Sequence, residues 1–171
     1  MLIFLVGFMG SGKSTLGKQL ARKLNYQYID QDHYIESKTA MTIADYFSTK
    51  GEESFRKLEH ETLKELLKLK DTVISTGGGT PCFFNNVELM NAGGLAIYLK
   101  LRPEILMSRL KNAQQERPLI KGKSESELLE FIKMKLKERE PYYLKAKCVI
   151  ESLDLKSDDL LQLVNYHNTD H

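Results

Sequence analysis

A glycine-rich stretch near the N-terminus is the strongest chemical signal in the sequence. It reads Gly7-Phe8-Met9-Gly10-Ser11-Gly12-Lys13-Ser14-Thr15 and fits the phosphate-loop pattern G-x-x-x-x-G-K-[ST]. The glycines let successive backbone N–H groups turn toward phosphate oxygens. Lys13 supplies a positive charge for the β and γ phosphates, and the Ser14 hydroxyl can ligate Mg²⁺. We therefore predict that a nucleoside triphosphate is bound by Gly10, Ser11, Gly12, Lys13, Ser14 and Thr15.

Two carboxylates follow the second predicted strand. Asp30 and Asp32 come directly after the short apolar pair Tyr28-Ile29. Ligands bind beyond the carboxyl ends of the strands in an open α/β sheet, so we expect both carboxylates on the side of the phosphate loop. One could hold a metal through water, and the other could accept a proton from an attacking hydroxyl. An Asp-x-Asp pair can also be a simple helix cap.

An arginine and a glutamate three residues apart, Arg56 and Glu59, share one face of a predicted helix. A guanidinium held by its own carboxylate can be aimed at an anionic substrate, whereas an exposed pair of this kind has little energetic effect. Gly77-Gly78-Gly79 follows the third predicted strand directly. Three glycines at that point allow close backbone approach to a ligand, which favours a functional role over a plain turn.

A polar stretch at about residues 111–124 separates two predicted helices and contains Arg117-Pro118-Leu119. Above a phosphate site, such a stretch is typical of a lid that excludes water and brings an arginine to the transferred phosphoryl group. Arg139 lies near the end of the next helix, shortly before Pro141. Either arginine alone is typical of a protein surface. Their occurrence with the phosphate loop and the carboxylates favours a functional interpretation.

Short apolar runs that alternate with helical patterns must position these groups, and they predict an α/β domain with a parallel sheet. The run Leu2–Val6 is apolar throughout, as in a strand buried on both faces. The predicted strands cover residues 2–6, 28–29, 73–74, 95–99 and 148–150.

Helical patterns fill the intervals between these runs. We expect Pro141 to kink or end the helix that contains it and the polar tail at residues 165–171 to be frayed. The predicted helices cover residues 13–24, a pair broken near Gly51, residues 103–110 and 125–146, and a terminal segment from Ser157.

The composition is that of an ordinary globular domain. The chain has 171 residues, of which 42% are hydrophobic, enough for a core without disulfides or structural metals. A net charge of +2, from 25 basic and 23 acidic residues, argues against a nucleic-acid binder. No apolar run is long enough to span a membrane, and two cysteines and four scattered histidines predict no zinc site. We expect a cytoplasmic monomer that binds neither nucleic acid nor membrane.

Taken together, the motifs resemble the shikimate kinase family in order and spacing, from residue 1 to about residue 150. The resemblance implies a P-loop kinase fold, with three α/β/α layers around a five-stranded parallel sheet in the order 2-3-1-4-5. It implies a single kinase domain over residues 1–171, a lid at about 111–124 and substrate-binding helices at about 32–68. The motifs that carry it are residues 7–15, Asp30-x-Asp32, Phe55-Arg56-x-x-Glu59, Gly77-Gly78-Gly79, Arg117-Pro118-Leu119 and Arg139-x-x-Tyr142.

The resemblance also implies an activity, which is Mg²⁺-assisted transfer of the γ-phosphoryl group of ATP to the 3-hydroxyl of shikimate. The product, shikimate 3-phosphate, leads to chorismate and the aromatic amino acids. By the same resemblance, Asp32 binds the substrate hydroxyls and takes the proton, while Lys13 and the lid residue Arg117 meet the phosphates.

The remaining roles come from the same resemblance. Ser14 and Asp30 lie on the metal side, and Arg109 flanks adenine. Guanidinium forks suit a planar carboxylate. The substrate pocket is assigned to Asp32, Arg56, Gly78, Gly79 and Arg139, with Ile43, Phe47 and Phe55 against the ring carbons.

Two alternatives stay open. One is a kinase for another acceptor, such as a gluconate-like hydroxy acid or a nucleoside monophosphate. The other is a nucleotide-binding regulator that keeps the fold without turnover. Two features depart from what a nucleotide site often carries: no acidic residue follows the third strand, and residues 151–156 contain no arginine to cover adenine.

Overall fold

The computed structural model describes residues 1–112 and 122–169. Within them, five parallel strands form one sheet in the order β2-β3-β1-β4-β5, which confirms the order that the resemblance implies. The strands are β1 (Leu2–Val6), β2 (Gln27–Asp30), β3 (Thr72–Ser75), β4 (Leu95–Lys100) and β5 (Cys148–Glu151).

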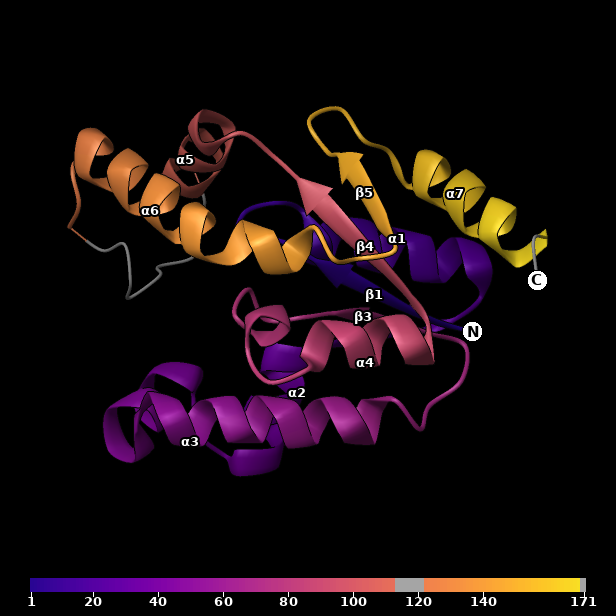
Figure 1. Ribbon diagram of the computed structural model, residues 1–171, viewed down its shortest axis with the longest axis horizontal. Helices are drawn as coiled ribbons and strands as arrows, with labels where there is room; N and C mark the ends of the chain where they lie inside the picture. The colour runs from indigo at the N-terminus through magenta and orange to yellow at the C-terminus, as the bar shows by residue number, and fades with distance from the viewer. Residues whose placement is uncertain (113–121, 170–171) are drawn as a thin grey trace.

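Helices cover both faces of the sheet (Figure 1). In this view α5 and α6 lie together at the upper left, α7 at the upper right, and α2 and α3 at the bottom below α4. A 3₁₀ turn, η1 (Thr80–Cys82), follows the glycine triplet. The helices are α1 (Lys13–Leu24), α2 (Gln31–Thr39), α3 (Ile43–Leu66), α4 (Asn86–Gly93), α5 (Pro103–Lys111), α6 (Glu125–Tyr143) and α7 (Ser157–Thr169).

The central strand β1 is buried on both faces, as its apolar run predicts. Because successive side chains of a strand point to opposite faces, Phe4 and Val6 join the core beneath α3, α4, α5 and α6. Ile3 and Leu5 join the second core, which α1 and α7 cover. Burial on both sides fixes β1, and with it the start of the phosphate loop at Gly7.

Three details of the helices differ from the sequence prediction. The break at Gly51 is present, with φ 78° and ψ 168°, but the chain also breaks earlier, where Ala40 adopts a left-handed conformation and Thr42 caps α3. Helix α6 ends at Tyr143, two residues after Pro141. The prediction of a frayed tail is wrong for residues 165–169, because α7 stays helical to Thr169; residues 170–171 lie outside the described residues.

The lid predicted at 111–124 falls mainly on residues 113–121, which lie outside the described residues. The segment at 32–68 that the resemblance assigns to substrate binding forms most of α2 and α3. No helix in the described ranges is both long enough and apolar enough to cross a lipid bilayer.

Helix α1 contains a glycine at its closest approach to the sheet. A Cβ on Gly17 would lie 2.8 Å from Cε2 of Tyr28 and 3.0 Å from Oγ of Ser75. Both neighbours are on strands that end at the predicted site. The absence of a side chain at Gly17 therefore allows α1, which begins at the phosphate loop, to lie against β2 and β3.

Gly17→Ala tests this packing. In an exposed helix, replacement of glycine by alanine stabilises by about 1 kcal/mol. Here we expect a loss of roughly 1–3 kcal/mol in the free energy of unfolding, because the methyl group overpacks the interface. Urea denaturation measures the change, and Gln19→Ala, at an exposed position of the same helix, is the control with little effect. A Gly17→Ala protein as stable as the parent would contradict the packing.

Candidate active site

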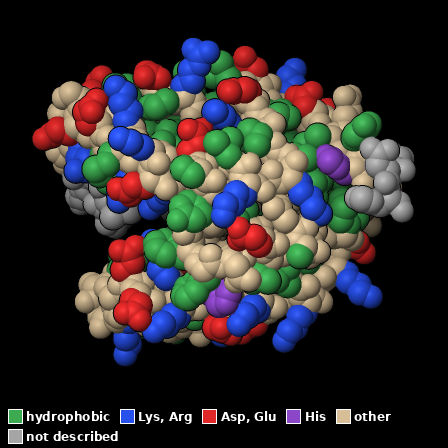
Figure 2. All heavy atoms as spheres, viewed as in Figure 1, with side chains coloured by type: hydrophobic (Ala, Val, Ile, Leu, Met, Phe, Trp, Pro, Cys, Tyr) green, Lys and Arg blue, Asp and Glu red, His purple; other side chains and the backbone are tan. Residues whose placement is uncertain are grey.

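A cavity of about 770 Å³ lies at the carboxyl ends of β1, β2 and β3. Its volume is in the range of small-molecule sites. Figure 2 shows the surface hollowed on the left of the view, between α6 and α3. The phosphate loop, the start of α2, the middle of α3 and the glycine triplet line the cavity, with Arg109 and Arg139. Residues far apart in the sequence are thus brought to one place.

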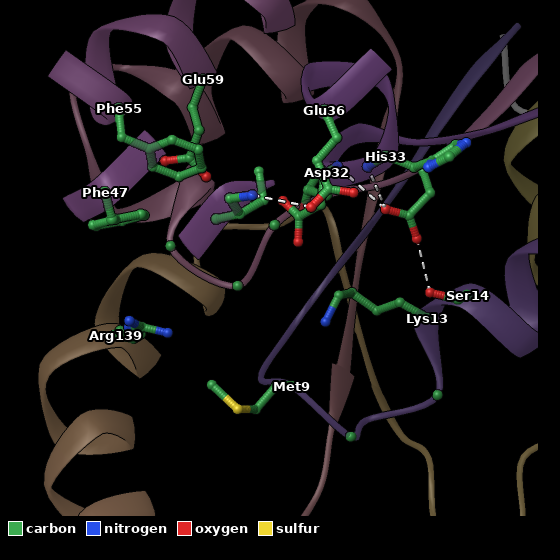
Figure 3. Close-up of a pocket in the computed structure, with 18 of the residues that line it drawn as sticks. Met9, Lys13, Ser14, Asp32, His33, Glu36, Phe47, Phe55, Glu59 and Arg139 are labelled. Carbon is green, nitrogen blue, oxygen red and sulfur yellow. Dashed lines mark hydrogen bonds between the residues drawn. The ribbon is translucent and has the colours of Figure 1, made fainter. Parts of the chain in front are cut away.

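The phosphate loop occupies one wall of this cavity. Lys13 lies at the first turn of α1 and its Nζ donates to the carbonyl oxygens of Gly7 (2.8 Å) and Phe8 (2.9 Å). The lysine is therefore folded back over its own loop, with the ammonium group facing the cavity (Figure 3). The positive end of the α1 dipole lies at the same point.

Asp30 is both a helix cap and a neighbour of the phosphate loop. Its Oδ1 accepts hydrogen bonds from the backbone N–H groups of Asp32 (3.2 Å) and His33 (3.4 Å), which caps α2. Its Oδ2 accepts from the Ser14 hydroxyl at 2.9 Å. The cap interpretation of the Asp-x-Asp pair is thus correct for Asp30, and the same geometry brings the two predicted metal-side residues together.

Asp32 projects into the cavity from the first turn of α2 (Figure 3). Burial raises the pKa of Asp32 to about 6, and the negative charges of Glu59 and Asp30 act in the same direction, while Lys13 opposes them. A carboxylate with this pKa is ionised at neutral pH and is still basic enough to accept a proton.

Arg56 is fixed by two carboxylates of its own helix. Its Nη1 donates to Glu59 at 2.6 Å, and its Nε and Nη2 donate to Glu52 at 3.2 and 3.0 Å. The Glu59 side chain is only 2% exposed, and Glu59 also accepts a hydrogen bond of 2.6 Å from the Thr80 hydroxyl. The predicted pair is thus a buried anchor rather than an exposed ion pair, so Arg56 is held at one orientation.

Gly77 and Gly79 are glycines because charged side chains pass close to their backbone. A Cβ on Gly77 would lie 2.7 Å from Oδ1 of Asp32 and 2.9 Å from Oε1 of Glu59. A Cβ on Gly79 would overlap the guanidinium group of Arg56. The triplet therefore allows Asp32, Glu59 and Arg56 to converge, which is a more specific reason than the flexibility of a turn.

Gly78 lies next to Arg139, which reaches the cavity from α6 (Figure 3). A Cβ on Gly78 would lie 3.4 Å from Nη1 of Arg139. The carbonyl oxygen of Gly78 accepts a hydrogen bond from the hydroxyl of Tyr143, a fully buried residue at the end of α6. The triplet and α6 are thereby joined, and Arg139 lies beside Gly78 while Arg56 lies beside Gly79.

Arg109 lies between the phosphate loop and the segment after β5. Its Nη2 donates to the carbonyl oxygens of Leu153 (3.1 Å) and Ser152 (3.5 Å), and its Nη1 lies 3.4 Å from the carbonyl oxygen of Ser11. Residues 151–156 contain no arginine of their own, but Arg109 reaches them from α5.

The cavity is lined by every predicted site residue that the structure describes except Ser11, which is buried. Arg117 lies outside the described residues. Ile43, Phe47 and Phe55 form the predicted apolar wall. The sequence interpretation did not identify Gln31, Glu52 or Thr80 as partners of the site. Gln31 is fully buried, and its amide donates to the carbonyl oxygen of Glu59 at 3.2 Å; a polar residue between two aspartates gave no signal of this contact.

Comparison with known proteins identifies the family of this chain. The family model "Shikimate kinase" matches residues 9–166. A shikimate kinase of Bacteroides fragilis is 44% identical, and the alignment covers 96% of this chain and 97% of that protein.

Solved structures agree with the sequence comparison. The crystal structure of shikimate kinase from Bacteroides thetaiotaomicron has a TM-score of 0.93 and 40% identity, over 99% of this chain and 98% of that chain. Shikimate kinase from Acinetobacter baumannii in complex with shikimate has a TM-score of 0.83 and 35% identity, over 99% and 93%. The chain therefore belongs to the shikimate kinase family, whose members are ATP-dependent phosphotransferases.

Proposed function

We propose that this protein transfers the γ-phosphoryl group of ATP to the 3-hydroxyl of shikimate, acting through the residues that line the cavity. The observation that carries the assignment is the placement of Asp32. It projects into the same cavity that the phosphate-loop lysine Lys13 and the two arginines Arg56 and Arg139 line. A ring that carries both an acid and an alcohol can bridge this arrangement.

Arg56 and Arg139 would bind the acid group of the substrate. Arginine donates paired N–H groups to a planar carboxylate, and these two arginines approach the glycine triplet from different helices. Phe47 and Phe55 supply apolar surface for the ring carbons. In this orientation the hydroxyls of the ring point away from the arginines and toward Asp32.

Asp32 would accept the proton of the attacking hydroxyl. The hydroxyl oxygen forms a bond to the γ-phosphorus, the bond from that phosphorus to the bridging oxygen breaks, and ADP leaves with the electron pair. The positive end of α1 and the Lys13 ammonium stabilise charge on the phosphate oxygens during transfer. The chain positions the reactants and supplies charge, as phosphoryl transfer requires.

Ser14 and Asp30 fit a magnesium ion. A hydroxyl and a carboxylate joined by a hydrogen bond beside the phosphate loop are hard oxygen donors, and Mg²⁺ characteristically takes few protein ligands and completes its shell with water and phosphate. When bound, the ion would neutralise charge on the β and γ phosphates.

The acceptor can be tested by measuring ADP release with ATP and shikimate, gluconate, AMP or CMP in parallel. We expect turnover with shikimate alone, because the cavity offers two arginines for an acid and apolar surface for a ring. Turnover with gluconate or a nucleotide alone would contradict the substrate assignment. ATP binding without turnover on any acceptor would favour a regulator.

Replacing Asp32 tests its role as the proton acceptor. Asp32→Asn removes the base and should lower kcat about 100-fold or more, with the KM for ATP nearly unchanged. In the parent enzyme, kcat/KM for shikimate should fall as the pH drops through about 6, the pKa of Asp32. An unchanged kcat in Asp32→Asn would remove Asp32 from the mechanism.

The same variant should be more stable than the parent above pH 6. The pKa of Asp32 is raised from its ordinary 3.8 to about 6 in the folded protein, so the ionised form opposes folding. The effect is fully present above pH 6 and vanishes below about pH 4. At pH 8, Asp32→Asn should raise the free energy of unfolding by on the order of 2–3 kcal/mol. Urea denaturation of the parent and the variant at pH 8 and at pH 4 measures this difference. If the variant gained the same free energy of unfolding at pH 4 as at pH 8, the charge of Asp32 would not be the cause.

Arg139→Ala tests the binding of the acid group. Loss of charged hydrogen bonds should raise the KM for shikimate about 10-fold to 100-fold and leave the KM for ATP within about twofold. Lys135→Ala is the control, since Lys135 lies on α6 one turn earlier and pairs with exposed Glu138. If Arg139→Ala raised only the KM for ATP, the assignment of Arg139 to the acid group of the substrate would be wrong.

A further inference from the structure

The guanidinium group of Arg56 is surrounded by aromatic rings as well as carboxylates. Its Cζ lies 4.4 Å from the ring centroid of Phe83 and 5.4 Å from those of Phe47 and Phe55. All three distances are within the range of a cation–π interaction. Phe83 is the nearest, and it comes from the segment after η1 rather than from α3.

The chain at Phe83 and Phe84 is held in an unusual conformation. Phe84 has φ 52°, in the left-handed region that a bulky side chain rarely adopts. The two neighbouring rings point in different directions. Phe83 faces Arg56, whereas Phe84 is 57% exposed and stacks on His60 at 4.7 Å. Such strain persists only where the surrounding structure enforces it.

Buried hydrogen bonds enforce this conformation. Asn86 is fully buried, its side-chain amide donates to the carbonyl oxygen of Thr80 at 2.8 Å, and its backbone N–H donates to the carbonyl oxygen of Phe83 at 3.3 Å. The Thr80 hydroxyl in turn binds Glu59, the partner of Arg56. The segment that carries Phe83 is therefore tied to the same anchor that holds Arg56.

We infer that Phe83 is a positioning residue for substrate binding, which fixes the plane of the Arg56 guanidinium group. Within the described chain, three of the five N–H groups of Arg56 donate to Glu52 and Glu59. One N–H group on each terminal nitrogen is left for a ligand. Carboxylates at the edges limit sliding of the group, and the ring of Phe83 limits its rotation out of plane. The remaining N–H groups then face a planar carboxylate without reorganisation.

This inference rests on the proposed function, in which Arg56 binds the acid group of shikimate. Phe83 does not need to touch the substrate; it acts through Arg56. Its loss should therefore change the affinity for the acid and leave the chemical step and the nucleotide unaffected.

Steady-state kinetics of Phe83→Leu and Phe84→Leu test the inference, with thermal melts to verify that both variants fold. We expect Phe83→Leu to raise the KM for shikimate about fivefold, with kcat and the KM for ATP within about twofold. Phe83→Tyr, which keeps the ring, should restore the parent KM. Phe84→Leu is the matched control, and its KM should equal that of the parent. An unchanged KM in Phe83→Leu, or an equal rise in Phe84→Leu, would overturn the inference.

A double-mutant cycle with Arg56→Met shows whether Phe83 acts through Arg56. In the Arg56→Met background, Phe83→Leu should produce no further rise in the KM for shikimate. Additive effects would overturn the inference and leave the proposed function intact. If Arg56→Met alone left this KM unchanged, the proposed binding role of Arg56 would fail instead. Phe83→Met replaces Phe83→Leu if the latter does not fold.

Discussion

The site depends on burying two carboxylates, Asp32 and Glu59, against the same glycine backbone. Burial in a partly dehydrated cavity opposes the ionisation of Asp32, and the nearby negative charge of Glu59 adds to this effect; the raised pKa of Asp32 is the consequence. Glu59 tolerates burial because Arg56 and Thr80 bind its two oxygens. The positive charge of Lys13 only partly offsets the charge of Asp32. We therefore propose that Glu59 has a structural role and that Asp32 accepts the proton.

The fold brings these groups together by ordinary rules of α/β sheets. Parallel strands end at one edge, so the phosphate loop after β1, the Asp30 cap after β2 and the triplet after β3 meet there. Helix α6 adds Arg139 from above this edge, and the hydrogen bond from Tyr143 to Gly78 ties that helix to the triplet. Carboxylates of α3 and the ring of Phe83 hold Arg56 at the same edge.

Much of the fold and of the site could be predicted, because the strands and the phosphate loop are marked by patterns of neighbouring residues. The phosphate loop fits a pattern, and β1 is apolar at every position. The contacts of Gln31, Thr80, Tyr143 and Phe83 could not be predicted, because each depends on which distant segment lies opposite. The tail was predicted to fray from its polarity alone; in the structure Val164 is buried and His167 lies 2.8 Å from the sulfur of Cys148, so packing on β5 overrides local preference.

The most direct measurement is an NMR titration of the Asp32 carboxyl carbon in the ligand-free enzyme, with Asp32→Asn used to assign its resonance. Our account predicts a midpoint near pH 6, with Glu59→Gln moving it downward because a neighbouring negative charge is removed. A midpoint near 3.8, the ordinary value for an aspartate, with no response to Glu59→Gln, would contradict the coupling of the two carboxylates on which the proposed mechanism rests.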